Sequence, residues 1–319
     1  MWWKVLLFVW IAALSAIGIV TPVAGDLGTV AMYAQMDATK RVPLKFTVVE
    51  KGRAATEAEG GGWLLRGRDA HDREADFHFS ARPADLDAAE GYLARARYDN
   101  ATHRVEVDHI LGEYPGFSFP FIPGLEERAK IIFFHVPMSW MTVIAFLVSM
   151  WYGIRYLRKK DMEDDFRSAL SAGLGLLFCI LATTTGSLWA KFNWGSFWNW
   201  DPRETSIFVL LLVYGAYFAL RSAIEIEEKK ATLSAVYSII AAATVPFFIF
   251  IMPRIMPGLH PGSADDVNAG PVVSSGGMDT SMRIVLYSML AGYLVLYGWL
   301  MRIQMRLHRI QLRRVEAAA

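Results

Sequence analysis

The sequence predicts an α-helical polytopic membrane protein of about six transmembrane helices, into which a small β-rich domain is inserted. Of its 319 residues, 54% are hydrophobic, a share too high for an ordinary soluble protein. Six separate segments are almost continuously apolar, and each approaches the ~20 residues that a membrane-spanning helix needs. The region between the first and second segments is rich in charged residues and has no long apolar run.

The first apolar segment runs from about Val5 to Val20 and follows Lys4. Its length is at the lower limit for a span, and Thr21–Gly25 also resembles the cleavage region of a signal peptide. We expect residues 1–25 to be retained as the first transmembrane helix, because the later spans form a consistent topology with it.

Residues 26–128 are predicted to be extracytoplasmic and to contain the β-rich insert, at about residues 41–115. Alternation of apolar and polar residues predicts five short strands, with breaks at Gly60–Gly62, Arg82-Pro83 and Asn100. This pattern favours a small antiparallel barrel or sheet, and an OB-like barrel is one candidate. The predicted strands are Leu44–Val49, Trp63–Arg66, Ala75–Phe79, Tyr92–Tyr98 and Arg104–Ile110.

Five further apolar segments are predicted to form a five-helix membrane domain over residues 129–304. Pro246 is expected to kink one of these helices, because proline has no N–H to donate and its ring clashes with the preceding turn. A basic tail, residues 305–319, follows the last segment. The predicted spans are about Ile131–Tyr156, Ala169–Leu188, Ser206–Leu220 (extending toward Ile224), Leu233–Met252 and Ile284–Met301.

The distribution of lysine and arginine predicts the orientation of the helices. Basic residues cluster at Arg155–Lys160, after the second span, and at Arg302–Arg314, after the sixth, while Lys4 precedes the first. Such clusters mark the cytoplasmic side of a membrane, so we expect both termini to be cytoplasmic. The loops that carry His135, the tryptophans and His260 then share the external side.

Composition narrows the classes of function. The formal net charge is only +1, which implies neither a nucleic-acid partner nor a polyacidic one. The single cysteine, Cys179, lies in an apolar run, so it can form no internal disulfide and is expected to be a packing residue. The sequence has no recognisable Ser/His/Asp set, carboxylate pair or phosphate-binding glycine loop, so no catalytic group is predicted.

A tryptophan-rich segment, about residues 189–206, is the most informative part of the chain. Four of the chain's eleven tryptophans fall within twelve residues here, and charged residues of both signs follow directly. Aromatic faces beside fixed charges suit a flat amphiphilic ligand with acidic substituents. A belt of tryptophans at the membrane interface is the alternative, but a belt needs neither Gly195 nor the charges. The residues are Trp189, Trp194, Trp198 and Trp200, followed by Asp201, Arg203 and Glu204.

This segment resembles the WWD signature of haem-handling proteins in cytochrome c maturation, and the CcmC family in particular. Phe197 stands where that family usually has another tryptophan, and Asp201–Thr205 is closer to the related CcsA family. The resemblance covers the chain well after Arg128 and only weakly before the insert, where Ala31–Asp37 looks like a short external loop. It rests on Thr185-Gly186-Ser187, Trp189, Lys191, Trp194-Gly195-Ser196, Trp198, Trp200-Asp201, Arg203 and Thr205-Ser206.

The resemblance implies a haem site with two histidine ligands. Histidines at two external positions of the family ligate the iron, and they match His135 and His260. Two neutral imidazoles can hold haem iron and still release it. Without the tryptophan motif, each would be read as an ordinary histidine at a helix end. The aromatic residues expected to line the macrocycle are Trp189, Trp194, Trp198 and Trp200.

The charged residues of the segment are expected to bind the haem propionates or to hold other residues in place. Arg203 is expected to bind a haem propionate. Asp201 has the same charge sign as the propionates, so it is expected to hold Arg203 or a loop amide in place. Other candidates for the propionates are Arg128, Lys191, Arg254 and Arg283.

Five other histidines lie outside this predicted site. His109, which Tyr114 follows, faintly resembles the end of the haem chaperone's own β domain, where a histidine near a tyrosine attaches haem. The other four are expected to be plain surface histidines: His71, His78, His103 and His308.

The resemblance further implies a protein of the bacterial inner membrane that binds haem b as cargo and presents it to a periplasmic, CcmE-like chaperone. Subunits of a membrane ABC transporter, CcmABD-like, and membrane lipid are the other implied partners. Such a protein is a delivery module and no enzyme. A CcsA-like cytochrome c synthetase component is the first alternative, although the spans lack the extra histidines of that family. A membrane scaffold or transporter with interfacial tryptophans is the second.

The topology gives a testable prediction. A reporter that is active only in the periplasm should be inactive when fused after Leu312, because the basic clusters place both ends in the cytoplasm. The same reporter inserted at Gly61, in the predicted external domain, should be active. Periplasmic activity of the Leu312 fusion contradicts the prediction.

Overall fold

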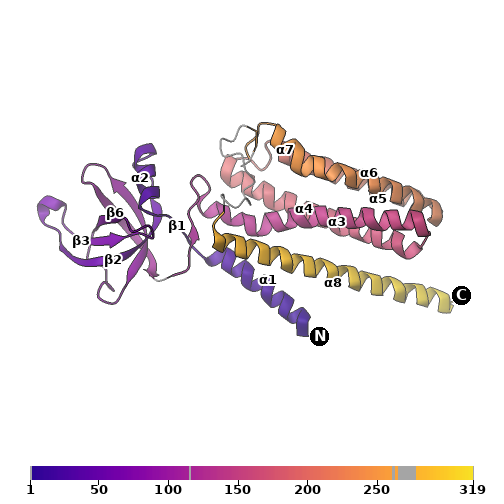
Figure 1. Cartoon of the computed structure of the whole chain (residues 1–319), viewed down its shortest axis with the longest axis horizontal. Coiled ribbons are helices and arrows are strands. Elements are labelled where there is room, and N and C mark those ends of the chain that lie inside the picture. The colour runs from indigo at the N-terminus through magenta and orange to yellow at the C-terminus, as the bar shows by residue number, and fades with distance from the viewer. Residues whose placement is uncertain (1, 115, 261–262, 265–277, 319) are drawn as a thin grey trace. The chain divides into compact units, whose positions relative to one another are not determined.

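The structure, a computed structural model, describes residues 2–114, 116–260, 263–264 and 278–318 (Figure 1). It contains two compact units. A helical unit comprises Met1–Ile19 and Lys130–Ala319, and a β-rich unit comprises Val20–Ala129.

Among the described residues of the helical unit, six helices are long and apolar enough to cross a membrane, which confirms the predicted number of spans. Each helix begins or ends beyond its predicted bounds, and the largest extensions are those of α4 through the first tryptophans and of α8 through the basic tail. The helices are α1 (Trp2–Val20), α3 (Ile132–Lys159), α4 (Met162–Trp194), α5 (Pro202–Ala223), α6 (Glu227–Pro246) and α8 (Thr280–Ala318).

Local signals explain where α4 and α5 begin and end. The Asp161 side chain accepts a hydrogen bond from the N–H of Glu163 and caps the start of α4. Gly195, with φ of 81°, takes the left-handed conformation that commonly ends a helix. Asp201 caps the start of α5, and Pro202 occupies its first position, where the missing N–H is no loss.

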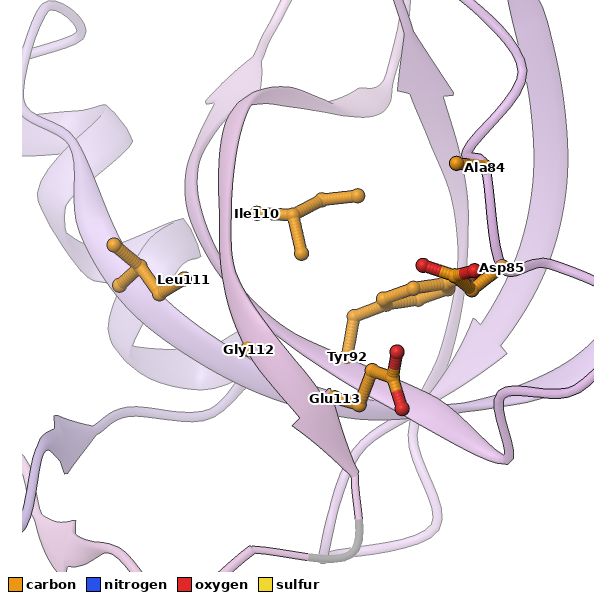
Figure 2. A pocket seen from close by; sticks show the side chains of 7 residues that line it. All are labelled: Ala84, Asp85, Tyr92, Ile110, Leu111, Gly112 and Glu113. Carbon is orange, nitrogen blue, oxygen red and sulfur yellow. The ribbon is translucent and has the colours of Figure 1, made fainter.

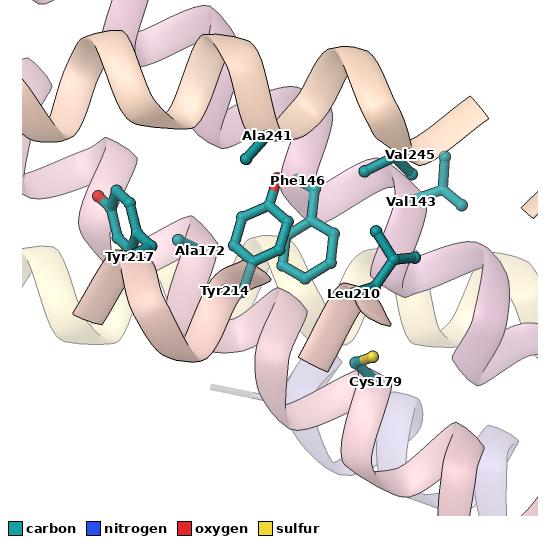
Figure 3. Close-up of a cluster of buried hydrophobic side chains, with 9 residues drawn as sticks. All are labelled: Val143, Phe146, Ala172, Cys179, Leu210, Tyr214, Tyr217, Ala241 and Val245. Atoms are coloured by element: carbon teal, nitrogen blue, oxygen red, sulfur yellow. The ribbon is translucent and has the colours of Figure 1, made fainter. Parts of the chain in front are cut away.

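The core of the helical unit is formed mainly by α3, α4, α5 and α6 (Figure 3). The rings of Phe146 and Tyr214 stack with their centroids 3.3 Å apart. Small residues let the helices approach, since a Cβ on Gly175 would lie 2.6 Å from the Phe146 ring. Cys179 is fully buried in this cluster, as expected of a packing residue.

Pro246 marks a change of helix type, in agreement with the expected distortion. The α-helix α6 ends at Pro246 and is followed by a π-helical segment, η3 (Phe247–Ile251), and a short helix, α7 (Met252–Ile255). A proline removes one helical hydrogen bond and crowds the preceding turn, so the chain leaves regular α-helical geometry here. The segment carrying His260 follows directly.

In the β-rich unit, five strands close into a barrel in the order β2-β3-β4-β6-β5. All five correspond to predicted strands. The expectation of a purely antiparallel arrangement was wrong at one place, because β4 and β6 pair in parallel. Ala31–Met36, expected in a loop, belongs to a helix. The elements are β1 (Val23–Ala24), α2 (Leu27–Met36), β2 (Val42–Ala54), β3 (Trp63–Arg68), β4 (Glu74–Phe79), β5 (Gly91–Asp99), β6 (Arg104–Tyr114) and β7 (Phe119–Pro120).

Aromatic side chains fill the barrel. Along β2, Val42, Leu44 and Phe46 alternate inward, as a period of two requires. The rings of Phe46 and Phe77 stack at 3.8 Å. They cover Gly67, where a Cβ would lie 2.7 Å from both rings.

His78 joins the two parallel strands near the barrel surface. Its Nδ1 lies 2.7 Å from Glu106 Oε2 and its Nε2 lies 2.7 Å from the Gly61 carbonyl oxygen. Burial alone would lower the pKa of His78, but these two acceptors outweigh it and raise the pKa above its ordinary value of 6.5. This histidine is therefore part of the barrel's structure and not the plain surface residue that the sequence predicted.

We predict that residues 20–129, expressed alone, show β-type circular dichroism and melt cooperatively. Because folding raises the pKa of His78, its stabilising contribution should be complete below about pH 6.5 and should be lost as the pH rises through the higher folded pKa. Thermal melts at successive pH values measure this loss.

A matched pair of variants isolates the effect. His78→Ala should remove this pH dependence, whereas His109→Ala, at an exposed position on β6, should retain it. An unchanged pH profile in His78→Ala contradicts the assignment, and a disordered spectrum of the fragment contradicts its independent folding.

Candidate functional site

The candidate site is built around the buried carboxylate of Asp201, the residue that caps α5. Asp201 is 4% exposed. Its Oδ1 accepts the N–H of Arg203 at 2.9 Å, and its Oδ2 accepts the N–H of Leu259 at 2.6 Å. Nδ1 of His260 lies 2.8 Å from Oδ1. One side chain thus joins the start of α5 to the segment that carries His260.

Asp201 is ionised near neutral pH. Burial would raise the pKa of its carboxyl, but the hydrogen bond from His260, together with the N–H groups of Arg203 and Leu259, lowers it to about 2. An ionised acceptor at Nδ1 keeps the proton of a neutral His260 on that nitrogen.

Two tryptophans pack against the imidazole of His260. The ring centroid of Trp194 lies 4.8 Å away in an edge-on arrangement, and that of Trp189 lies 5.6 Å away. Trp189 and Trp194 also contact each other at 5.0 Å. Both residues belong to the last turns of α4, although the sequence predicted a loop beginning at Trp189.

His135 lies near the start of α3 and contacts α4. Its Nδ1 lies 3.0 Å from the Ala182 carbonyl oxygen and 3.2 Å from Thr185 Oγ1. The Thr185 hydroxyl donates to backbone carbonyls of its own helix, so it can accept the Nδ1 proton. Gly186 gives the ring room, because a Cβ there would lie 2.9 Å from His135 Cε1.

Both histidines therefore use Nδ1 for hydrogen bonding within the protein. Across the described parts of the chain, no hydrogen bond to Nε2 of His135 or His260 is found. His260 and Arg203 are also close enough to His135 to interact with it electrostatically. The structure thus brings the two histidines near each other, each with an Nε2 lone pair for a ligand.

The remaining predicted tryptophans form a different aromatic group. Trp198 and Trp200 contact each other at 5.8 Å, and both contact Phe208 of α5 at 6.2 Å. Trp200 is 67% exposed. The four tryptophans thus form two pairs, of which only Trp189 and Trp194 contact His260.

The predicted propionate-binding residues are distributed unevenly. The backbone N–H of Arg203 donates to the capping side chain of Asp201, and the charge of Arg203 interacts with Asp201 and Arg254. Lys191 donates to the Gly195 carbonyl oxygen at 2.8 Å, and its Nζ lies over the ring of Phe197. The other two candidates, Arg128 and Arg283, lie in the β-rich unit and in the first turn of α8 respectively.

Glu204, which had no predicted role beyond its charge, holds the α4–α5 connection together. It is 7% exposed, and its Oε2 accepts the N–H of Asn199 at 2.6 Å and of Asp201 at 3.3 Å. Asp201 and Glu204 form a capping box. The spacing of a capping aspartate and a glutamate three residues later is a recognised signal and identifies this role.

The β-rich unit has an acidic cluster and a hollow, neither of which contains a predicted ligand. Asp26, Asp69 and His71 could together hold a metal ion by their proximity. However, Arg73 donates to both carboxylates, at 2.7 and 2.8 Å, so its guanidinium already occupies them and offsets part of their charge. This cluster is better explained as the attachment of α2 to the β3–β4 turn.

A shallow hollow of about 450 Å³ lies at one end of the barrel, beside Asp85, Tyr92 and Glu113 (Figure 2). It contains none of the predicted site residues. His109 is not among its lining residues and is exposed on β6, opposite Arg95. No geometry here supports the faint resemblance around His109.

Comparison with known proteins identifies the family. The profile of a family described as "CcmC: Heme exporter protein C" matches residues 120–319, more than half of the chain. The chain belongs to this family. The matched range includes His135, the tryptophans and His260, and it excludes the five barrel strands.

Individual relatives agree with this assignment to the CcmC family. A heme exporter protein C of Paracoccus denitrificans is 29% identical over 197 residues, which are 62% of this chain and 80% of the relative. That of Bradyrhizobium diazoefficiens is 33% identical over 121 residues, 38% of this chain and 46% of the relative. A cytochrome c biogenesis protein CcsA of Gossypium hirsutum is 32% identical over 128 residues, 40% of this chain and 36% of the relative.

Membership in the CcmC family supports a role in haem handling for cytochrome c maturation. Together with the six apolar helices, it identifies the chain as a multi-pass protein of the inner membrane. Haem is therefore the ligand whose chemistry is compared with the groups of the site. Two Nε2 atoms beside flat aromatic rings and an arginine match the needs of an iron porphyrin with acidic substituents.

The contact between Gly186 and His135 gives a testable prediction. Gly186→Ala should displace the His135 ring, because the new methyl group would overlap Cε1. Overpacking of this kind costs about 1–3 kcal/mol, and the displaced ring should also lower the haem content of the purified protein. Thermal unfolding and haem absorbance measure the two effects.

Gly215→Ala is the matched control, since a Cβ at this helical position of α5 meets nothing within 4 Å. Helical glycine is less stable than alanine by roughly 0.5–1 kcal/mol, so this variant should be equally or slightly more stable and keep its haem. If Gly186→Ala behaves like Gly215→Ala, the packing role of Gly186 is refuted.

Proposed function

We propose that the chain binds haem b as cargo, with His135 and His260 as its axial ligands, and presents it on the external side of the membrane to a periplasmic haem chaperone. One observation carries the proposal: both histidines are held through Nδ1, by Ala182 and Asp201 respectively. A histidine fixed in this way has Nε2 oriented and unprotonated, as metal ligands commonly are.

The surroundings of His260 suit a cargo that is held and later released. Trp189 and Trp194 give the imidazole a rigid aromatic wall, which limits access of water to a bound macrocycle. Arg203 is the best partner for a propionate among the nearby charges. Coordination holds the iron, and the protein supplies position and surroundings for the cofactor's own chemistry.

The external location rests on the basic clusters and on the order of the helices. With both termini in the cytoplasm, the α4–α5 connection and the His260 segment lie on the opposite side. The proposed partners are a CcmE-like chaperone and subunits of a membrane ABC transporter, CcmABD-like, which would supply any ATP-driven step. On this proposal the chain delivers haem and has no enzymatic activity of its own.

We also propose that the barrel is OB-like and external. Its order β2-β3-β4-β6-β5, with one parallel pair between β4 and β6, agrees with a five-stranded Greek-key barrel. The barrel lies between α1 and α3 in sequence. If both helices span the membrane, the barrel is on the side where α1 ends and α3 begins.

A CcsA-like synthetase component is the second candidate. It is favoured by the segment Asp201-Pro202-Arg203-Glu204-Thr205 and by the CcsA-named relative. Against it, His135 is the only histidine in the predicted spans. A purified synthetase would transfer haem covalently to an apocytochrome, whereas a delivery protein would transfer it to a chaperone, so the acceptor distinguishes the two.

The ligand assignment predicts specific spectra. The purified protein should carry haem b with a low-spin spectrum, because two imidazoles are strong axial ligands. Either His135→Ala or His260→Ala should shift the spectrum toward high spin and weaken retention, and the double variant should nearly abolish binding. Absorption spectra and haem content measure these effects.

Two kinds of variant serve as controls. His109→Ala, in the barrel, should leave the spectrum unchanged. Trp198→Ala or Trp200→Ala should preserve the spin state but lower haem occupancy or transfer, because packing and not coordination is lost. A normal low-spin spectrum in the double histidine variant shows that the ligand assignment is wrong.

A further inference from the structure

The two histidines are held by acceptors of different charge. Nδ1 of His260 lies 2.8 Å from the carboxylate of Asp201. Nδ1 of His135 lies 3.0 Å from the Ala182 carbonyl oxygen and 3.2 Å from the Thr185 hydroxyl, both of which are neutral. An ionised acceptor draws the Nδ1 proton more strongly than a neutral one, which makes the opposite nitrogen a better electron donor.

This carboxylate is well placed to act through the imidazole. The Asp201 side chain is fully buried, so solvent screens its charge little. Two charged groups interact with it: Arg203 through its charge, and Glu204, whose Oε2 accepts the Asp201 N–H. These two have opposite signs, so they partly offset each other, while the direct contact with His260 remains.

We propose that Asp201 makes His260 the stronger of the two axial ligands, so that His135 is the ligand that leaves the iron first when haem is handed over. This inference rests on the proposed function. It assigns to Asp201 a positioning and electronic role that the haem site would lack if both histidines were held by carbonyl groups. An electron-rich ligand favours ferric over ferrous iron, so the bond to His260 should lower the reduction potential.

The simpler role of Asp201 as a helix cap does not account for the whole arrangement. A cap requires only the bond to the Arg203 N–H. Here the segment before His260 also approaches so closely that a Cβ on Gly258 would lie 2.7 Å from Asp201 Oδ2. The absence of a side chain at Gly258 thus allows both the Leu259 N–H and the His260 ring to reach the same carboxylate.

The first test compares reduction potentials of the haem-loaded full-length protein. Asp201→Asn preserves the shape of the cap but removes the charge, and it should weaken the preference for ferric iron about tenfold, or about 59 mV for one electron. Glu204→Gln is the matched control, because it removes an equal charge from the same capping box without touching a histidine. If the two variants shift the potential equally, general charge loss explains the effect and the inference fails.

The second test examines each ligand alone. Reduced His135→Ala keeps His260, and reduced His260→Ala keeps His135, so resonance Raman spectra give the iron–histidine stretching frequency of each. We expect a higher frequency for His260, falling to the His135 value when Asp201→Asn is added. Equal frequencies in the two single variants overturn the inference.

A third measurement needs neither haem nor a variant at Asp201. In the haem-free protein labelled with ¹⁵N-histidine, NMR should show His260 with its proton on Nδ1 in a strong hydrogen bond, and a weaker one for His135. The same bond strength at both residues contradicts the inference, even if Asp201→Asn fails to fold.

The order of ligand loss is tested with imidazole. Added to the ferric wild type, imidazole should give the spectrum and potential of His135→Ala plus imidazole, not those of His260→Ala plus imidazole. The reverse match overturns the order. A low-spin spectrum that survives in the double histidine variant instead refutes the proposed function, so the two failures are distinguishable.

Discussion

The hydrogen bonds of the Asp201 carboxylate are the interactions on which the rest of the site depends. A buried carboxylate is stable only when hydrogen-bond donors compensate for its lost hydration, and here the donors come from two distant parts of the sequence. The N–H of Arg203 is at the start of α5, while the N–H of Leu259 and the ring of His260 follow α7. This one residue therefore helps to fix both the start of α5 and the position of His260.

The connection from α4 to α5 determines how the tryptophans are divided. Gly195 ends α4 in a left-handed conformation, and Trp200 also has a positive φ, of 57°. A positive φ is unfavourable for a residue with a large side chain, and the two bonds from Asn199 and Asp201 to Glu204 hold the chain there. The two tryptophans before Gly195 therefore lie against His260, and the two after it turn toward α5.

Much of the fold could be predicted because apolar runs and alternation directly report burial. The spans and the five strands are of this kind. Hydropathy placed the end of α4 too early, because the apolar run stops at Leu188, whereas the helix continues to Trp194 and ends only at Gly195. The sequence pattern could not show the parallel pairing of β4 with β6, which depends on contacts distant in sequence. The bond between Asp201 and His260 spans fifty-nine positions, and only the glutamate at 204 left a local signal.

Buried carboxylates have different partners at the two ends of α4 and α5. At the end away from the site, Asp165 pairs with both terminal nitrogens of Arg221 at 2.7 and 2.9 Å, and Asp164 pairs with Arg155 at 3.1 Å. Since α4 has 33 residues, about 50 Å at 1.5 Å per residue, it exceeds the ~30 Å hydrocarbon thickness, and both ends can lie near water.

Carboxylates paired with arginine bind helix to helix, because a guanidinium on a neighbouring helix donates to each of them. At the other end, Asp201 is compensated by backbone N–H groups and by a histidine whose second nitrogen is not hydrogen-bonded within the described chain. The buried negative charge is thus stabilised by salt bridges at one end of the helices. At the other end it is stabilised by backbone N–H groups and by the proposed metal ligand His260. The carboxylates at the first end thus join helices to one another, whereas Asp201 at the other end holds the histidine proposed as a ligand.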